Sequence, residues 1–178
     1  MSDIPADARR ETWDSVYEES VKLAHLIAKA CEQSGEAFDS MIVIARGSYF
    51  PVNIISRELG FLATDMLHVS MTSYVSGTTK QEEFKLGQMP AKSQIRGRNL
   101  LIIDEVCDTG RTFEYLTNWL KEQGAALVRT GVIHYKENQS TTGFVPDYFV
   151  VKTDEWIVYP WEVHDHPEPS HVKRPAKD

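Results

Sequence analysis

Short runs of uncharged, largely aliphatic residues are the feature that most constrains the fold of this chain. The clearest are MIVIA at residues 41–45 and NLLII at residues 99–103. Runs this short and this apolar predict strands that are buried on both faces, as in a parallel sheet. Apolar residues also recur at helical spacing over residues 11–34 and over residues 110–123. Strands that alternate with helices predict an α/β fold with a doubly wound, mainly parallel sheet.

The remaining elements fit the same alternation. Further strands are expected at residues 66–70, 126–135, 148–151 and 156–159, and a second helix between residues 45 and 60, with Pro51 near its first turn and Gly60 after its end. Residues 72–98 are polar and show no period. We expect them to form a long mobile loop without regular structure, which in a small domain usually has a function.

The length of 178 residues fits a single domain. We expect this domain to span residues 1–165. A polar, proline-containing tail at residues 166–178 should be frayed. It includes His166 and His171, and with His164 these could bind a metal, but a solvated tail is the simpler interpretation.

Charge and cysteine content exclude several classes of protein. The net charge of −7 provides no general basic field for nucleic acid. Only Cys31 and Cys107 occur, without the spacing of a disulfide framework or a metal site. The N-terminal residues lack an apolar signal core, and no run approaches the length that spans a membrane. We therefore expect a cytoplasmic protein that binds neither nucleic acid nor membranes.

Ligands of doubly wound sheets bind beyond the carboxyl ends of the strands. The segment that follows NLLII is unusual at this place. Two adjacent carboxylates, Asp104 and Glu105, come directly after the strand, and Asp108 follows three residues later. Carboxylates here can accept hydrogen bonds from sugar hydroxyls and help to hold a divalent cation through its waters.

The next four residues form a turn into the predicted helix. Thr109, Gly110, Arg111 and Thr112 offer backbone N–H groups, two hydroxyls and a helix N-terminus, which together make an anion site. Gly110 allows the backbone to approach a ligand closely. A simple helix cap would explain Asp108 and Thr109, but it gives the paired acids no role.

The whole segment resembles the motif by which type I phosphoribosyltransferases bind phosphoribosyl pyrophosphate (PRPP). The resemblance implies a parallel-sheet core with a small hood built largely from C-terminal segments. It implies that Asp104 and Glu105 bind the ribose hydroxyls, and that residues 108–112 bind the 5′-phosphate. Glu105 stands where many members have a second Asp, although Glu also occurs there.

Two further segments fit the same family. Arg46 and Gly47 follow the first strand and resemble its pyrophosphate loop, in which the peptide before the basic residue is typically cis. Ser73 and Tyr74 open the long polar loop, as in the mobile catalytic loop of hypoxanthine-guanine phosphoribosyltransferases.

A last group of residues resembles the base site of the xanthine-guanine and hypoxanthine enzymes. The resemblance implies that Lys136 faces a 6-oxo group, that Trp156 stacks on the purine, and that the main chain of Ile157 binds base edges. It implies that Glu162 orders a metal ion and its waters, with Asp104 and Glu105 as further groups near that ion. A surface lysine and a core tryptophan are the structural alternatives.

The resemblance thus implies a Mg²⁺-dependent purine phosphoribosyltransferase, usually a homodimer or homotetramer, with Asp108 accepting a proton from the incoming base. Two alternatives remain. One is a regulator of the same fold that binds PRPP without turning it over, although such proteins usually carry a DNA-binding domain or a basic face. The other is an enzyme for a non-purine acceptor, which Lys136 and Trp156 disfavour. Cys107 has no activating partner at a recognisable spacing, so we interpret it as a small buried residue and not a nucleophile.

Overall fold

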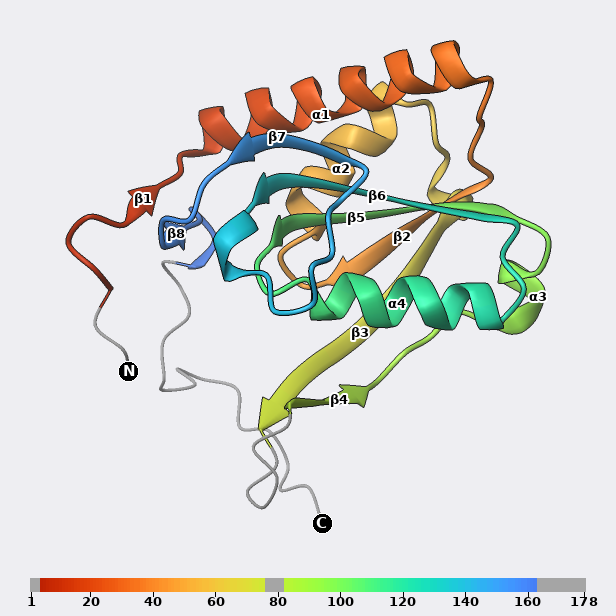
Figure 1. The fold of residues 1–178 in the computed structure, drawn as a ribbon. Coiled ribbons are helices and arrows are strands. Elements are labelled where there is room, and N and C mark those ends of the chain that lie inside the picture. The colour runs from red at the N-terminus through yellow and green to blue at the C-terminus, as the bar shows by residue number, and fades with distance from the viewer. Residues whose placement is uncertain (1–3, 76–81, 163–178) are drawn as a thin grey trace, which may run out of the picture.

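The computed structural model describes residues 4–75 and 82–162 (Figure 1). Its centre is a six-stranded sheet in the order β4-β3-β2-β5-β6-β7. Five strands are parallel, and β4 is antiparallel to β3. The bounds are β2 (Ser40–Ala45), β3 (Met66–Val75), β4 (Glu82–Leu86), β5 (Asn99–Cys107), β6 (Leu127–Tyr135) and β7 (Tyr148–Lys152).

Helices cover both faces of this sheet. Figure 1 shows α1 (Trp13–Ser34) and α2 (Tyr49–Glu58) on one face and α4 (Arg111–Glu122) on the other. Shorter helical turns are α3 (Lys92–Ile95), η1 (Ala63–Asp65) and η2 (Glu137–Gln139). The arrangement confirms the predicted doubly wound, mainly parallel α/β fold.

The central strand β5 shows how the sequence produces these layers. Successive side chains of a strand point to opposite faces. Leu101 and Ile103 pack with α1 and α2, whereas Leu100 and Ile102 pack with α4. All four are fully buried. A strand that is apolar at every position is therefore needed, because neither face meets water.

Helix α1 begins and ends where its sequence provides caps. The Thr12 hydroxyl accepts a hydrogen bond from the Ser15 N–H at 3.1 Å, and the Ser15 hydroxyl accepts one from the Thr12 N–H at 2.9 Å. Gly35 ends the helix with a φ of 74°, which only glycine adopts without strain. The predicted helix over residues 11–34 is thus nearly correct.

The prediction of a structureless loop over residues 72–98 is wrong for much of its length. Strand β3 continues to Val75, and β4 returns antiparallel to it, with Ser73 opposite Phe84. The polar composition of residues 72–86 gave no strand signal, because an edge strand of a sheet needs no continuous apolar run. Residues 76–81 of the predicted mobile loop lie outside the described residues, as does the predicted tail at 166–178.

The strand predicted near residue 156 belongs to a separate two-stranded sheet. Strand β8 (Ile157–Val158) pairs in parallel with β1 (Arg9–Arg10), and Arg9 lies opposite Ile157. The hood was expected largely from C-terminal segments, but the N-terminal segment supplies one of its two strands. Two arginines give no strand signal, so only the tertiary pairing reveals β1. Among the described residues, no helix has the length and apolar character to cross a membrane.

Burial of β5 predicts a large cost for truncating it. We expect Ile102→Ala to lower the free energy of unfolding by about 2–5 kcal/mol, because it removes buried atoms and leaves a cavity. The matched control is Leu62→Ala, since Leu62 is 68% exposed and should change stability little. Urea denaturation followed by circular dichroism measures both, and an Ile102→Ala effect as small as the control would contradict the packing described here.

Candidate active site

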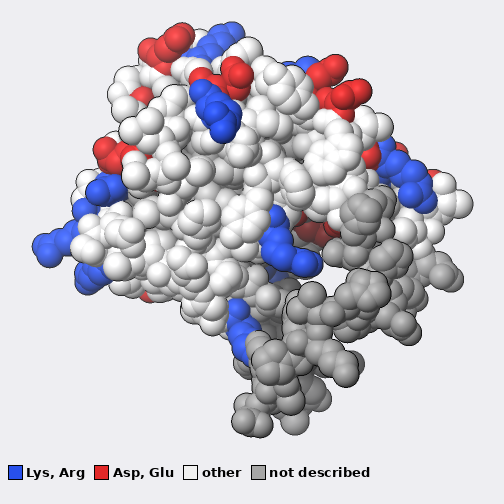
Figure 2. Space-filling view, turned by 180° about the vertical axis from the view of Figure 1, so that it is seen from behind, with Lys and Arg blue, Asp and Glu red and all other residues white. Residues whose placement is uncertain are grey.

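The predicted site residues gather at one edge of the sheet. Strands β2, β5 and β6 are adjacent and parallel, so their carboxyl ends lie together, and β1 and β8 lie near the same edge (Figure 1). On the face shown in Figure 2, acidic side chains lie recessed in a hollow with basic side chains beside them. Charges of both signs are dispersed over the rest of that face.

The acid pair lies inside β5, which extends four residues beyond the predicted strand. The Glu105 N–H donates to Asp104 Oδ1 at 2.9 Å. Burial and the neighbouring Glu105 carboxylate raise the pKa of Asp104 well above its usual range. Glu105 Oε2 is buried without a hydrogen-bond partner in the described part of the chain. This pair of neighbouring carboxylates favours a ligand that brings hydroxyl donors or positive charge.

Gly47 brings the loop after β2 against this acid pair. A Cβ atom on Gly47 would lie 1.9 Å from Glu105 Oε1, so a side chain there would displace the Glu105 carboxylate. Glycine therefore allows the loop and the carboxylate to lie in contact as they do. The Ala45–Arg46 peptide is cis, as the resemblance implied. Arg46 thus stands at the carboxyl end of β2, beside the strand that carries the acids.

The turn from β5 to α4 is the predicted anion site. Gly110 has a φ of 80° and provides no side-chain cap for α4. The first N–H to bond back is that of Glu114, which donates to the Gly110 carbonyl at 2.9 Å. The N–H groups of Thr112 and Phe113, which precede Glu114 in α4, have no hydrogen-bond partner within the helix, as in helix N-termini that bind anions. A cavity of about 370 Å³ lies at this turn, lined by Asp104, Val106, Cys107, Asp108, Thr109, Gly110, Thr112 and Phe113.

Asp108 and Lys136 meet across two strand ends. Lys136 Nζ lies 3.5 Å from Asp108 Oδ2, and the Lys136 N–H donates to the Cys107 carbonyl at 3.0 Å. The Lys136 side chain is only 11% exposed, whereas that of Asp108 is 52% exposed. Lys136 is therefore no ordinary surface lysine. Its ammonium points to the turn formed by residues 108–112, the predicted phosphate turn.

The hood positions the remaining predicted residues near this edge. Trp156 is half exposed, and its carbonyl accepts from the Arg9 N–H at 2.8 Å. Ile157 is buried in the hood. Glu162 Oε2 accepts from the Tyr159 N–H at 2.9 Å, which closes the turn after β8. Trp156 is thus not the core tryptophan that was the structural alternative.

Sequence reasoning missed two contributors to the site. The Thr141 N–H donates to the Thr109 carbonyl at 3.0 Å, and a Cβ atom on Gly110 would lie 2.7 Å from Thr142 Oγ1. The polar loop after η2 therefore packs against the phosphate turn. The Tyr159 hydroxyl donates to the Glu105 carbonyl at 3.1 Å and so fixes the backbone of the acid pair. Tyr159 stood within the segment that resembles the base site, but nothing in the sequence indicated this contact.

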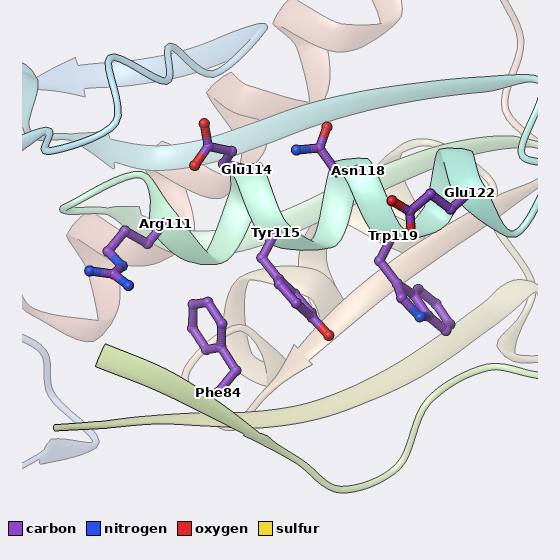
Figure 3. Close-up of a pocket in the computed structure, with 7 residues that line it drawn as sticks. All are labelled: Phe84, Arg111, Glu114, Tyr115, Asn118, Trp119 and Glu122. Atoms are coloured by element: carbon purple, nitrogen blue, oxygen red, sulfur yellow. The ribbon is translucent and has the colours of Figure 1, made fainter. Parts of the chain in front are cut away.

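A second hollow of about 440 Å³ lies on the side of α4 that faces β4. Figure 3 shows its lining, with Phe84 from β4 below the side chains of α4. The ring centroids of Phe84 and Tyr115 are 5.0 Å apart. Arg111, at the start of α4, lies at one end of this hollow. Ser73 and Tyr74 lie in β3, opposite Phe84 and Glu83 in the hairpin.

Comparison with known proteins gives one family. The phosphoribosyl transferase domain model matches residues 12–168. A xanthine-guanine phosphoribosyltransferase of Roseobacter denitrificans is 28% identical over 166 residues, covering 85% of this chain and 84% of that protein. A hypoxanthine-guanine phosphoribosyltransferase of Lactococcus lactis is 30% identical, covering 78% and 76%. A crystal structure of a purine phosphoribosyltransferase from Pyrococcus horikoshii has a TM-score of 0.70 at 25% identity, covering 93% and 97%.

Cys107 borders the acids but is poorly suited to act as a nucleophile. Its side chain is almost completely buried. Burial, reinforced by the Asp104 and Asp108 carboxylates, raises the pKa of the thiol to about 12. The reactive thiolate is therefore scarce near pH 7.

This environment predicts a large difference in reactivity between the two cysteines. We expect iodoacetamide at pH 8 to alkylate the partly exposed Cys31 of the native protein well before Cys107. Peptide mass spectrometry over time measures both sites, and the urea-unfolded chain, in which both should react alike, is the control. Equal rates in the native protein would show that the Cys107 thiol is neither buried nor suppressed.

Proposed function

This chain belongs to the phosphoribosyl transferase family, and we propose that it is a purine salvage enzyme that transfers the 5-phosphoribosyl group of PRPP to a 6-oxopurine, with release of pyrophosphate. The observation that carries the proposal is the edge of β5. An acid pair and a helix N-terminus follow one another there in one short segment, and the largely buried Lys136 meets them from the end of β6. Hypoxanthine, guanine and xanthine are the candidate bases.

The proposed PRPP site uses the ends of two strands. Asp104 and Glu105 accept hydrogen bonds from the ribose hydroxyls, which would give the buried Glu105 oxygen a donor. The residues from Asp108 to Thr112, Arg111 among them, bind the 5′-phosphate through N–H groups and hydroxyls. Arg46 and the amide of Gly47 bind pyrophosphate, where Gly47 lies against the acid pair.

The acid pair also suits the Mg²⁺ that we propose as cofactor. Asp104, Glu105 and Glu162 offer the carboxylate oxygens that this ion binds directly or through its waters. When bound together with PRPP, Mg²⁺ neutralises the charge that develops on the leaving pyrophosphate. The carboxylates of the chain hold the ribose in place for that departure.

The proposed base site lies between Lys136 and the hood. The carbonyl of Trp156 accepts a hydrogen bond from Arg9 in β1, and that of Val158 accepts one from Glu11 directly after β1. Because backbone polar groups alternate sides along a strand, those of Ile157 point away from β1, where a base edge can meet them. The half-exposed Trp156 ring can stack on the purine, and Lys136 can donate to its 6-oxo group.

Asp108 is the proposed catalytic base. Loss of pyrophosphate leaves positive charge on the ribose ring, as in glycosyl transfer generally. Asp108 lies beside the phosphate turn and within reach of Lys136, so it can accept the proton that the base releases when its ring nitrogen attacks. Water must be excluded meanwhile. We propose that the segment beginning at Ser73 and Tyr74 closes the site. Residues 76–81 of this segment lie outside the described residues.

A regulator that binds PRPP without turnover is the competing proposal. A buried lysine paired with a candidate base favours an enzyme, because binding PRPP alone requires neither. A non-purine acceptor is disfavoured by the same lysine together with Trp156. A pyrophosphate-release assay across purine and pyrimidine bases separates the three.

We also propose that the protein is a homodimer or homotetramer of the cytoplasm. Trp13 and Phe50 are 53% and 42% exposed and contact each other edge to face, with ring centroids 5.1 Å apart. Exposed aromatic clusters of this kind are common at interfaces between subunits. Both cysteines are free, which suits a reducing compartment.

The first prediction from this function concerns Asp108. Asp108→Asn should lower kcat by roughly 100- to 10,000-fold, because the amide cannot accept the proton. PRPP affinity should change far less, since the amides of the phosphate turn remain. Stopped-flow kinetics with PRPP binding by calorimetry separate the two effects, and Asp14→Asn on the exposed start of α1 is the control. Near-normal turnover would remove Asp108 from the mechanism.

The second prediction concerns the choice of base. The Lys136 ammonium is a donor without acceptor capacity, so it complements a 6-oxo group but opposes the amino group of adenine. Sites of this kind reject the mismatched base by roughly 10⁴–10⁵. Adenine should be a very poor substrate while at least one oxopurine turns over well.

Lys136→Ala should reduce the ratio of the oxopurine kcat/KM to the adenine kcat/KM, mainly by lowering the oxopurine value. Lys121→Ala, at an exposed position, is the matched control. The measurement is kcat/KM for hypoxanthine, guanine, xanthine and adenine with all three proteins. An adenine value equal to the best oxopurine in the wild type would overturn the base site while leaving the PRPP site intact.

A further inference from the structure

A buried polar cluster joins the hood to α1 and β6, outside the proposed substrate site. His134 Nε2 lies 3.2 Å from Glu11 Oε1 and 3.5 Å from Glu19 Oε2. The side chains of His134, Glu11 and Glu19 are 0%, 3% and 10% exposed. Three potential ligands from three segments of the chain thus converge, each with an atom within 4.8 Å of the others.

The hydrogen bonds around Tyr159 fix the tautomer of His134. The Tyr159 oxygen lies 2.9 Å from His134 Nδ1 and 3.1 Å from the Glu105 carbonyl oxygen. A carbonyl oxygen can only accept, so the single Tyr159 proton is donated to Glu105. His134 Nδ1 must then carry the proton that Tyr159 accepts. The lone pair of the neutral imidazole therefore lies on Nε2.

This lone pair points at two carboxylates. Within the described part of the chain, His134 Nε2 and Glu19 Oε2 are buried and make no hydrogen bond, despite their short separation. Three acceptor atoms that face one another away from water repel and lose their hydration. The space between them therefore suits a positively charged species, either a metal ion or a shared proton.

We propose that Glu11, Glu19 and His134 bind a divalent transition-metal ion of the Zn²⁺ type. Zn²⁺ bound to imidazole and carboxylates at tetrahedral angles holds its ligand atoms about 3.3–3.5 Å apart. The two His134 contacts, at 3.2 and 3.5 Å, match this spacing. The hydrogen bond from Nδ1–H to Tyr159 is the outer contact that a metal-bound histidine usually makes.

Arg9 is compatible with an ion at this place. It donates through Nε to Glu11 Oε1, and through Nη2 to Glu19 Oε1 at 3.2 Å. Each carboxylate oxygen has two lone pairs, so the guanidinium leaves one on Glu11 Oε1, and it leaves Glu19 Oε2 untouched. The Ser15 hydroxyl donates to the other oxygen of Glu11 and orients that carboxylate. A bound ion would tie α1 and the segment that precedes it to β6.

The test is metal binding by the full-length protein without an affinity tag and without PRPP. Protein stripped with a chelator is titrated with Zn²⁺ by calorimetry, and the retained metal is counted by mass spectrometry after dialysis. We expect about one Zn²⁺ per chain. Glu19→Gln and Glu11→Gln should weaken this binding more than about 100-fold, and Tyr159→Phe about 10- to 100-fold. Circular dichroism establishes that each variant is folded.

Three controls isolate the site. Glu18→Gln, on the same helix but 68% exposed, should bind Zn²⁺ as the wild type does. Asp104→Asn should also retain it, because that carboxylate belongs to the proposed substrate site. A variant with His164, His166 and His171 all changed to Gln excludes binding by the tail.

Two outcomes would overturn the proposal. One is a wild-type protein that binds no Zn²⁺ at micromolar concentration, and a Glu19→Gln variant as stable as the wild type would then show that a shared proton balances the cluster. The other is Zn²⁺ binding that Glu19→Gln and Glu11→Gln leave unchanged. Neither depends on the purine transfer proposed above, because catalysis is not measured.

Discussion

Carboxylates that lie side by side repel each other when both are ionised, and they lose hydration when they are buried. Asp104 and Glu105 therefore constrain the residues that pack around them. They lie inside β5, the strand that forms the middle of the core, and Ile103 directly before them is fully buried. The Glu105 carboxylate fills the space that a side chain on Gly47 would occupy. The raised pKa of Asp104 reflects the unfavourable energy of burying its charge beside Glu105. A ligand rich in hydroxyls and bound to a cation would relieve it.

The hood depends on the same strand through a chain of hydrogen bonds. Tyr159 follows β8 and donates to the Glu105 carbonyl, while it accepts from His134 on β6. His134 in turn faces Glu11, which precedes α1, and Glu19, which lies in α1. The N-terminal segment therefore supports the proposed base site from behind, although it supplies no residue of the site predicted from sequence. This is why the pairing of β1 with β8 matters beyond its two residues.

The sequence predicted the fold well wherever a local signal was strong. Apolar runs such as residues 99–103 correctly predicted strands covered on both faces, and the helical spacing over residues 11–34 predicted α1 to within two residues. The prediction was wrong for the hairpin of β3 and β4, because edge strands tolerate polar residues. The proposed site residues after β2, β5 and β6 were found because the carboxyl ends of parallel strands meet at one edge.

The sequence by itself determined the doubly wound sheet, the segment that bears the acids and the glycine-containing turn before α4, since each is encoded by neighbouring residues. Only the tertiary structure decided that Lys136 is buried against Asp108, that Gly47 packs on Glu105, and that two arginines near the N-terminus pair with β8. The cluster of Glu11, Glu19 and His134 was likewise decided only by the tertiary structure. These contacts join residues far apart in the chain. Their energies depend on burial and on three-dimensional distance, which local sequence patterns do not specify.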